Sequence, residues 1–170
     1  MRRISTVLIA GVAVLALGAC AKKRPPVLPP SPGQQQAPAE TGPAGDAYGP
    51  DSAEAFKRAV TSDTVHFALD QYDIDAEARP ILDSQAQWLV QHPNVRVTIE
   101  GHCDERGTRE YNLALGDRRA NAAKNYLAAR GVDASRMTTI SYGKERPIAL
   151  GSDEASWAQN RRAVTVVLSQ

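Results

Sequence analysis

The stretch VTIEGHCDERGTREYNLALGDRRANAAKNYL, residues 97–127, decides the fold because it joins two kinds of hydrophobic periodicity. It begins inside residues 95–100, where Val95, Val97 and Ile99 alternate with polar side chains. That alternation is typical of a strand with one face in contact with water. The polar loop GHCDERGT follows, and helical spacing begins directly after it. The sequence therefore predicts a strand that passes through a short loop into a helix.

The helix that follows the loop is predicted over residues 109–130. Thr108 is suited to cap its start, Glu110 places a negative charge in the first turn, and Gly131 stands just past its end. Both ends of this helix are therefore marked in the sequence.

Further elements are expected on either side of this unit. They are, in chain order, a short helix at 51–60, a strand at 64–69, an amphipathic helix at 76–91, a strand at 136–142, a short helix at 154–159 and a strand at 163–168. Helices that alternate with strands favour a sheet with crossover connections. The predicted fold class is α/β, as an α+β sandwich in which one mixed sheet has crossover helices packed on one side.

Charge and cysteine usage restrict the function. The chain has 170 residues and a formal net charge of +1. A protein that binds nucleic acid normally carries a strong basic excess, so no nucleic-acid partner is expected. Cys20 and Cys103 stand in unlike surroundings, and no disulfide between them is expected. No cofactor is expected, because the sequence has no phosphate-cradling glycine loop.

The N-terminus has the features of an export signal. Residues 1–19 combine a basic start with an apolar run at 4–17, which is too short for a bilayer of roughly 30 Å that needs about 20 residues. The run ends in LGAC, which resembles the lipobox of bacterial lipoproteins and implies that Cys20 is acylated and becomes the first mature residue. Because Ala21 is not Asp, family analogy favours the outer membrane, with the folded part in the periplasm. The alternative is an ordinary signal peptide with a cysteine nearby.

A proline-rich segment separates Cys20 from the folded part. Residues 21–50 consist mainly of Pro, Gly, Gln and Ala, with few side chains able to build a core. In an extended polyproline conformation this segment reaches at most about 90 Å. We therefore expect a signal peptide at 1–19, lipidated Cys20 with a disordered linker at 20–50, and one domain at 51–170.

The predicted helix at 109–130 has one face for packing on the sheet, formed by Leu113, Gly116, Ala120, Ala123 and Leu127. The flank of that face carries Asn112, Leu115, Arg119 and Tyr126. Arg119 is thus expected at the edge of the core, partly shielded, and Asp104 lies in the loop that enters the helix. A carboxylate and a guanidinium suit a ligand with both an ammonium and a carboxylate group, because each charge meets its opposite.

Four runs strongly resemble the OmpA C-terminal-like family: TVHFALDQYDI at 64–74, the stretch at 97–127, SYGKERP at 141–147 and NRRAV at 160–164. The similarity covers residues 62–168. It implies non-covalent binding of the diaminopimelate residue of peptidoglycan stem peptides, without an enzymatic reaction. By motif position, Asp104 is implied to hold the ammonium group and Arg119 the carboxylate. The implied pocket wall is completed by Leu69, Asp70, Arg106 and Leu115.

The resemblance also implies partners. Such a protein tethers the outer membrane to peptidoglycan, is held there by lipid on Cys20, and works with TolB and the Tol system in envelope integrity and in constriction of the outer membrane during division. Two positions depart from the family pattern. Position 103 is usually alanine or another small or polar residue and is Cys103 here, whose thiol either pairs between chains or stays buried. Position 68 is often acidic and is Ala68 here.

Other interpretations of these residues remain open. Asp104 and Arg119 could form a structural ion pair. The other arginines, Arg118, Arg161 and Arg162, are expected to be structural or solvated. A metal site at residues 102–104 is disfavoured, because neighbouring residues on an extended loop point to alternating sides.

Two other classes of function compete with peptidoglycan binding. A cell-wall hydrolase or amidase needs a metal set or a nucleophile with a base, and no such set of catalytic residues is evident. A pure interaction hub is the third class. Under the binding hypothesis, Asp104→Ala and Arg119→Ala are each expected to weaken binding to peptidoglycan and to leave the fold intact.

Overall fold

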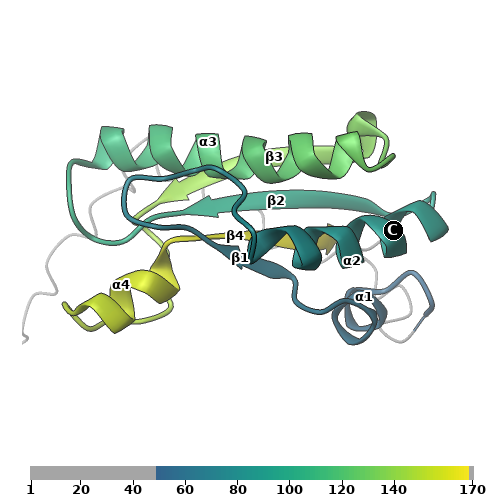
Figure 1. Cartoon of the computed structure of the whole chain (residues 1–170), viewed down its shortest axis with the longest axis horizontal. Coiled ribbons are helices and arrows are strands. Elements are labelled where there is room, and N and C mark those ends of the chain that lie inside the picture. The colour runs from purple at the N-terminus through teal and green to yellow at the C-terminus, as the bar shows by residue number, and fades with distance from the viewer. Residues whose placement is uncertain (1–48, 169–170) are drawn as a thin grey trace, which may run out of the picture. The chain divides into compact units, whose positions relative to one another are not determined.

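The computed structural model describes residues 49–168, which form one sheet with its helices (Figure 1). The elements in chain order are α1 (Ala53–Ala59), β1 (Thr64–His66), α2 (Ala78–Gln91), β2 (Arg96–His102), α3 (Arg109–Ala129), the 3-10 helix η1 (Ala134–Arg136), β3 (Met137–Gly143), α4 (Glu154–Asn160) and β4 (Arg162–Leu168). Each predicted helix and strand is present. The predicted signal peptide, Cys20 and almost all of the predicted linker lie outside the described residues.

The sheet is mixed, and its strand order is β1-β4-β2-β3. β2 and β3 are parallel, whereas β4 is antiparallel to both β1 and β2. Ile99 in the centre of β2 pairs with Thr139 of β3 on one side and with Thr165 of β4 on the other. A parallel pair requires a crossover, and α3 provides it. The predicted fold class is confirmed.

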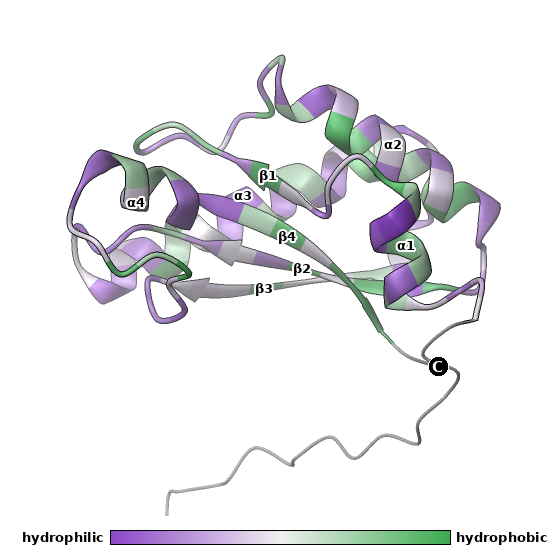
Figure 2. Cartoon of the chain, turned by 90° about the horizontal axis from the view of Figure 1, so that it is seen from below, coloured by the Kyte–Doolittle hydropathy of each residue, from purple (hydrophilic) through white to green (hydrophobic). Residues whose placement is uncertain are grey.

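Helices α2 and α3 bury the apolar face of the sheet. In Figure 2, which colours the chain by hydropathy, α3 lies behind the strands. The core lies between these two helices and the sheet. Its buried side chains include Leu82 and Leu89 of α2, Leu127 of α3, and Val97 and Ile99 of β2. Full burial of each such side chain contributes about 1.5–3 kcal/mol. The other face of β2 and β3 is polar, as the predicted alternation requires, and there the hydroxyls of Thr98 and Thr138 lie 2.9 Å apart.

Helix α3 begins and ends where the sequence predicts. The Thr108 hydroxyl accepts a hydrogen bond from the Tyr111 amide at 3.2 Å, which caps the start. At the other end Gly131 has a φ of 97°, and the Val132 amide donates to the Leu127 carbonyl at 3.2 Å. This is a Schellman termination, in which glycine takes the left-handed conformation without a steric penalty. The cap fixes the loop of residues 103–108 against the first turn of α3.

Predicted boundaries differ from the observed ones by one or two residues at several elements, and the largest difference lies before α2. The strand predicted at 64–69 ends at His66, because the chain turns away and Asp70 has a φ of 57°, which no strand residue adopts. The helix predicted from residue 76 begins at Ala78. The Asp75 carboxylate accepts hydrogen bonds from the amides of Glu77 and Ala78 and caps the helix from three residues upstream of its first residue.

β2 and α3 are in close contact at two glycines. A Cβ atom on Gly101 would collide with the Gly116 carbonyl, and one on Gly116 would collide with the Ser141 hydroxyl. The absence of both side chains lets the helix approach the strand where β2 is about to end. The loop that follows β2 and the first turns of α3 are thereby held close together.

Within residues 49–168, no helix combines the length and the apolar character that crossing a membrane requires.

Candidate functional site

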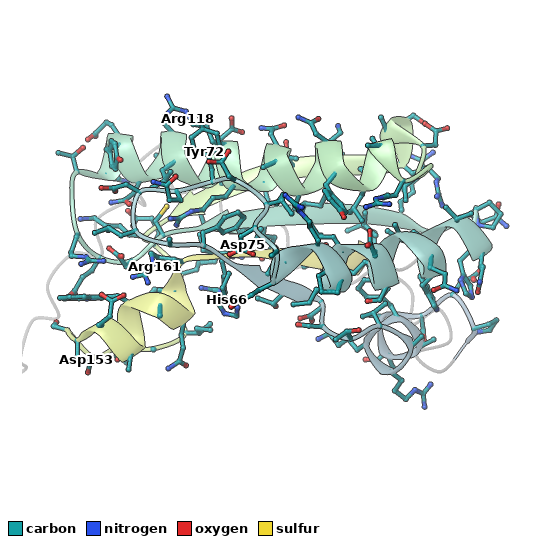
Figure 3. All side chains as sticks on the ribbon, in the orientation of Figure 1. His66, Tyr72, Asp75, Arg118, Asp153 and Arg161 are labelled. Atoms are coloured by element: carbon teal, nitrogen blue, oxygen red, sulfur yellow. The ribbon has the colours of Figure 1, made fainter. Side chains whose placement is uncertain are left out.

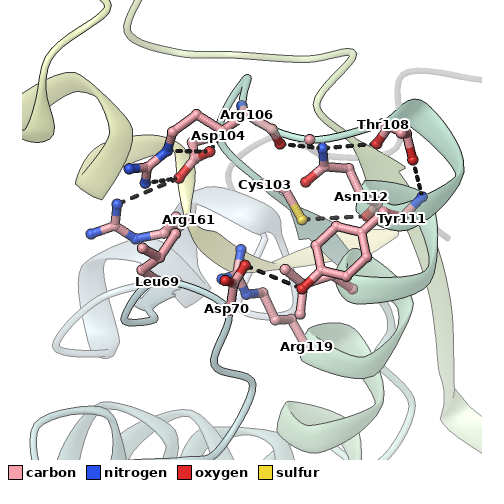
Figure 4. A pocket seen from close by; sticks show the side chains of 12 residues that line it. Leu69, Asp70, Cys103, Asp104, Arg106, Thr108, Tyr111, Asn112, Arg119 and Arg161 are labelled. Atoms are coloured by element: carbon pink, nitrogen blue, oxygen red, sulfur yellow. Dashed lines mark hydrogen bonds and ion pairs between the residues drawn. The ribbon is translucent and has the colours of Figure 1, made fainter.

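A pocket of about 620 Å³ opens where the loop after β1, the loop after β2, the first turns of α3 and the end of α4 come together (Figure 4). It is lined by Leu69, Asp70, Cys103, Asp104, Arg106, Gly107, Thr108, Tyr111, Asn112, Leu115, Arg119 and Arg161. Three guanidinium groups and two carboxylates are among these side chains. The pocket therefore offers charges of both signs, with a small positive excess.

All six residues that the sequence assigned to a ligand pocket line this one. Asp104 and Arg106 come from the loop after β2, and Leu115 and Arg119 from α3. Leu69 and Asp70 were expected at the end of the first strand, but they lie in the loop that follows it. Their gathering agrees with the predicted site, and their role in ligand binding remains a prediction.

Asp104 is buried and surrounded by arginine N–H groups. Its Oδ1 accepts from the Arg106 amide at 3.1 Å and from Arg106 Nε at 3.1 Å. Its Oδ2 accepts from Arg106 Nη2 at 2.6 Å and from Arg161 Nη1 at 3.5 Å. Burial acts to raise the pKa of the Asp104 carboxyl, but these hydrogen bonds outweigh it and the pKa lies below the usual value. Asp104 is thus an anion at neutral pH.

Arg119 is fully buried, with 0% of its surface exposed, rather than partly shielded as predicted. Its guanidinium donates to three backbone carbonyls: Gln71 at 2.8 Å, His102 at 2.9 Å and Ala68 at 3.2 Å. The chain segment of residues 67–71 passes over the guanidinium and supplies two of these acceptors. Burial is the main cause that lowers the pKa of Arg119, yet an arginine stays charged at neutral pH.

The contacts of Arg119 leave part of its guanidinium available. A guanidinium has five N–H groups, and three of them are used by the carbonyls. The Cys103 side chain is a further hydrogen-bond partner of Arg119. One N–H group therefore remains for another acceptor. A carboxylate that entered the pocket could accept from it, and charge-assisted bonds of this kind are stronger than neutral ones.

The structure does not pair Asp104 with Arg119, as the alternative of a structural ion pair required. The partners of Asp104 are Arg106 and Arg161. Arg161 was expected to be structural or solvated, and it is both buried and part of the pocket lining. Its Nε donates to the Phe67 carbonyl at 2.9 Å, and its Nη2 bonds to Glu154 at 2.7 Å.

Sequence reasoning missed Arg161 as a pocket residue because it is far from Asp104 along the chain and follows the short helix α4. The neighbouring arginines show why the motif alone is not sufficient. Arg162 is also buried, but it bonds to backbone carbonyls outside the pocket, at Asn160 and Arg146. Arg118 is exposed on α3 and lies 5.8 Å from the ring of Tyr72 (Figure 3). Of the three, only the arginine that directly follows α4 reaches the pocket.

Asp70 and Tyr111 form the opposite wall from Arg106. The Tyr111 hydroxyl donates to Asp70 Oδ1 at 3.1 Å. The left-handed backbone of Asp70 directs the loop back over α3. Leu69 and Tyr111 stay 49% and 47% exposed, which is high for apolar and aromatic side chains at the edge of a cavity.

The base of the pocket is held by Asn112 and Cys103. The Asn112 amide group donates to the carbonyls of Arg106 at 2.7 Å and Thr108 at 3.0 Å, which fixes the loop on the helix. The Cys103 thiol is buried and bonds to the Asn112 carbonyl at 3.3 Å. Burial raises the pKa of this thiol, so it stays protonated. Of the two fates predicted for Cys103, the described residues support the buried one.

His102 lies directly before this pocket but on the other side of the strand. Its ring is buried, and both ring nitrogens lack a hydrogen-bond partner within residues 49–168. Burial, together with Arg162 and Arg146, lowers its pKa to about 4. No group of three metal-ligating side chains occurs in the described part of the chain.

Comparison with known proteins identifies the family to which this chain is similar. The model of the OmpA family matches residues 66–161. The peptidoglycan-associated lipoprotein of Rhizobium meliloti is 51% identical over 161 residues, which cover 95% of this chain and 86% of the relative. That of Haemophilus influenzae is 50% identical over 125 residues, which cover 70% and 82%. These names describe an association and not a reaction, in agreement with the prediction that the chain is not an enzyme.

Solved structures agree with this placement. The crystal structure of the peptidoglycan-associated lipoprotein from Burkholderia pseudomallei is 44% identical, with a TM-score of 0.63, and the match covers 72% of this chain and 98% of that one. The C-terminal domain of Helicobacter pylori MotB shares the fold at 20% identity and a TM-score of 0.58, covering 64% and 85%. The chain therefore belongs to the OmpA family and, within it, to the peptidoglycan-associated lipoproteins.

Proposed function

We propose that this chain is an outer-membrane lipoprotein that binds peptidoglycan non-covalently, through the side-chain end of diaminopimelate in the stem peptides. Lipid on Cys20 holds it to the membrane, residues 20–50 act as a spacer, and the domain from residue 51 reaches the wall in the periplasm. The names of the relatives support binding to peptidoglycan, and the signal-like N-terminus supports a lipid anchor on Cys20. The charges of the pocket support diaminopimelate as the group that is bound.

One observation carries the proposal: the pocket combines a fully buried guanidinium, which keeps one N–H group beyond its carbonyl and thiol contacts, with two nearby carboxylates. The side-chain end of diaminopimelate carries an ammonium and a carboxylate on one carbon. We assign its carboxylate to Arg119 and its ammonium to Asp104, with Asp70 as a second negative group. Leu69 and Leu115 then contact the methylene carbons of the ligand, and Arg106 and Arg161 surround Asp104.

The test is co-sedimentation of the full-length chain with purified sacculi of the diaminopimelate type. Asp104→Asn and Arg119→Lys are expected to lower the bound fraction strongly. Asp104→Asn removes the negative charge that meets the ligand ammonium, and Arg119→Lys keeps the positive charge but loses the planar guanidinium and its several N–H donors. Matched controls are Asp117→Asn and Arg118→Lys, which make the same changes at exposed positions of α3 outside the pocket. Equal binding by site variants and controls contradicts the assignment.

The same experiment separates binding from hydrolysis. Sacculi incubated with the chain are expected to stay intact and to release no muropeptides. Release of muropeptides, lost in Asp104→Asn, contradicts the proposal and supports the hydrolase or amidase. Sacculi of the lysine type supply a second comparison, because their stem peptides lack the side-chain carboxylate and are expected to bind less.

We also propose that TolB and the Tol system use the edge of this pocket, in envelope integrity and in constriction of the outer membrane during division. The exposed Leu69 and Tyr111 support a protein partner there, since large exposed apolar side chains are favoured at interfaces. A partner that covers them blocks the pocket. Purified TolB is then expected to release the chain from sacculi, and simultaneous binding of TolB and sacculi contradicts a shared surface.

A further inference from the structure

The acceptor positions of Asp104 are filled by donors of the protein itself. An ionised carboxylate has about four lone-pair directions. Here four N–H groups approach the two oxygens, three from Arg106 and one from Arg161. An ammonium group that enters the pocket therefore meets a carboxylate with no vacant acceptor direction. Binding of an ammonium at Asp104 requires that one of these donors leave.

Of the two guanidinium groups, that of Arg106 is the one placed to leave. The Arg161 side chain is 8% exposed and is held by the Phe67 carbonyl at 2.9 Å and by Glu154 at 2.7 Å. The Arg106 side chain is 33% exposed. The Arg106 backbone amide also donates to Asp104 and keeps the carboxylate oriented when the side chain moves.

A second set of partners for the Arg106 guanidinium already exists beside the first. Its Nη1 lies 3.9 Å from Glu154 Oε2, and its central carbon lies 4.0 Å from the centre of the Trp157 ring. Both belong to α4, and neither lines the pocket. An ion pair and a cation–π contact therefore remain available to Arg106 after it gives up Asp104.

We propose that the Arg106 guanidinium is an internal occupant of the ammonium position, which a ligand ammonium displaces toward Glu154 and Trp157. This deepens the proposed function and rests on it, because Asp104 must be the acceptor of the ligand ammonium. Arg106 then opposes binding of every ligand that carries the amino group and does not oppose one that lacks it. This role is the reverse of a direct ligand contact, which the sequence resemblance implied for the same residue.

The experiment uses two tripeptides that differ only in the amino group. One is L-alanyl-γ-D-glutamyl-meso-diaminopimelate, and the other has 2-aminopimelate as its third residue and so keeps the side-chain carboxylate alone. Calorimetry with the full-length chain in detergent measures both affinities for the wild type and for Arg106→Met, which removes every side-chain donor at similar length. Arg109→Met is the control, since Arg109 is exposed and pairs with Glu145 outside the pocket.

Arg106→Met is expected to strengthen binding of the diaminopimelate peptide by about three- to tenfold, as the loss of one competing charge pair allows. Binding of the aminopimelate peptide is expected to stay constant or weaken. Arg106→Lys, which keeps the charge but not the bidentate contact, should fall between the wild type and Arg106→Met. Arg109→Met should match the wild type for both peptides.

Weaker binding of both peptides by Arg106→Met overturns the proposal and makes Arg106 a direct ligand contact. An unchanged ratio of the two affinities also overturns it, because the ammonium group then goes to Asp70 or to solvent. Either result leaves non-covalent binding of peptidoglycan standing, and an unchanged ratio moves the ammonium assignment away from Asp104. A wild-type chain that binds neither peptide instead contradicts the proposed function itself.

Discussion

Two arginines hold the chain together at opposite ends of β2, and they do so in the same way. Arg136 donates to the carbonyls of His92 at 2.8 Å, Val95 at 3.0 Å and Leu89 at 3.0 Å, before β2 begins. Arg119 donates to three carbonyls where β2 ends. A guanidinium bonded to three carbonyls is therefore a structural device in this fold, and it does not by itself mark a binding site.

The surroundings make the difference between the two ends. Arg119 is fully buried and borders a cavity that also contains Asp70 and Asp104. Arg136 is partly exposed and does not line that cavity. The pocket end thus gathers charges of both signs around a cavity, whereas the other end lies outside that cavity. Four predictions test this contrast, from the largest expected effect to the smallest.

The largest effect is expected from loss of the buried guanidinium. Arg119→Leu should lower the free energy of unfolding by about 4 kcal/mol, because three buried carbonyls lose a charged donor. This revises the expectation that removal of Arg119 leaves the fold intact. Arg136→Leu should lower the free energy by about 2 kcal/mol, since water can reach its carbonyls. Urea unfolding measures both, and equal losses would contradict the contrast.

The pH dependence of stability should reflect His102. Its folded-state pKa of about 4 lies below the ordinary value of 6.5, so the unfolded chain binds the proton more readily. Stability should therefore fall by about 3 kcal/mol as the pH drops from 6.5 to 4. Glu100, 3.5 Å from the ring, does not offset burial and the facing arginines, Arg146 and Arg162.

His102→Phe is the control for this pH effect, because it keeps a ring against Tyr142, whose centre is 5.5 Å away, and removes the titrating group. Its stability should change much less between pH 6.5 and pH 4. Asp104 affects stability in a lower pH range. Because its pKa is depressed in the folded state, its contribution to the free energy of unfolding is present above pH 3.8 and is lost only below that pH. A slope that survives in His102→Phe would show that another group titrates.

The third prediction concerns the loss of stability when a side chain is added where β2 and α3 approach each other closely. Gly101→Ala should lower the free energy of unfolding by about 2 kcal/mol or more, because its Cβ meets the Gly116 backbone, which cannot move aside freely. The comparison is Gly131→Ala at the far end, where the nearest side-chain atom is 3.8 Å away and only the positive φ is unfavourable. That change should cost about 1 kcal/mol. Thermal unfolding of both variants decides the order.

The smallest effect is expected at Cys103. Cys103→Ala removes one buried thiol and should lower the free energy of unfolding by about 1 kcal/mol, with binding to sacculi unchanged. The thiol lines the pocket, bonds to the Asn112 carbonyl and contacts Arg119, but the proposed assignment gives it no direct bond to a ligand charge. A large loss of sacculus binding would show that the sulfur takes part in the site.

The elements of the fold could be predicted from the sequence because their signals are local. Alternation marks β2, and Thr108 and Gly131 mark both ends of α3. The pairing of the strands has no such local signal, and the mixed order became certain only in the structure. The end of β1 was placed too late because Phe67 and Leu69 continue the apolar pattern although the chain has turned.

Most residues of the pocket could be predicted from the sequence, but their hydrogen-bond and ion-pair partners could not. Motif positions and the helical wheel brought Asp104 and Arg119 together, since both lie on one strand-loop-helix unit. The full burial of Arg119 depends on the chain segment of residues 67–71, which no local pattern places over α3. Arg161 approaches Asp104 from a distant segment for the same reason.

The most direct test is a crystal structure of the chain with L-alanyl-γ-D-glutamyl-meso-diaminopimelate bound. The side-chain carboxylate should accept hydrogen bonds from Arg119, the ammonium should donate to Asp104, and the methylene carbons should contact Leu69 and Leu115. A peptide that binds elsewhere, or one that leaves Arg119 without a ligand contact, would contradict the proposed recognition of peptidoglycan.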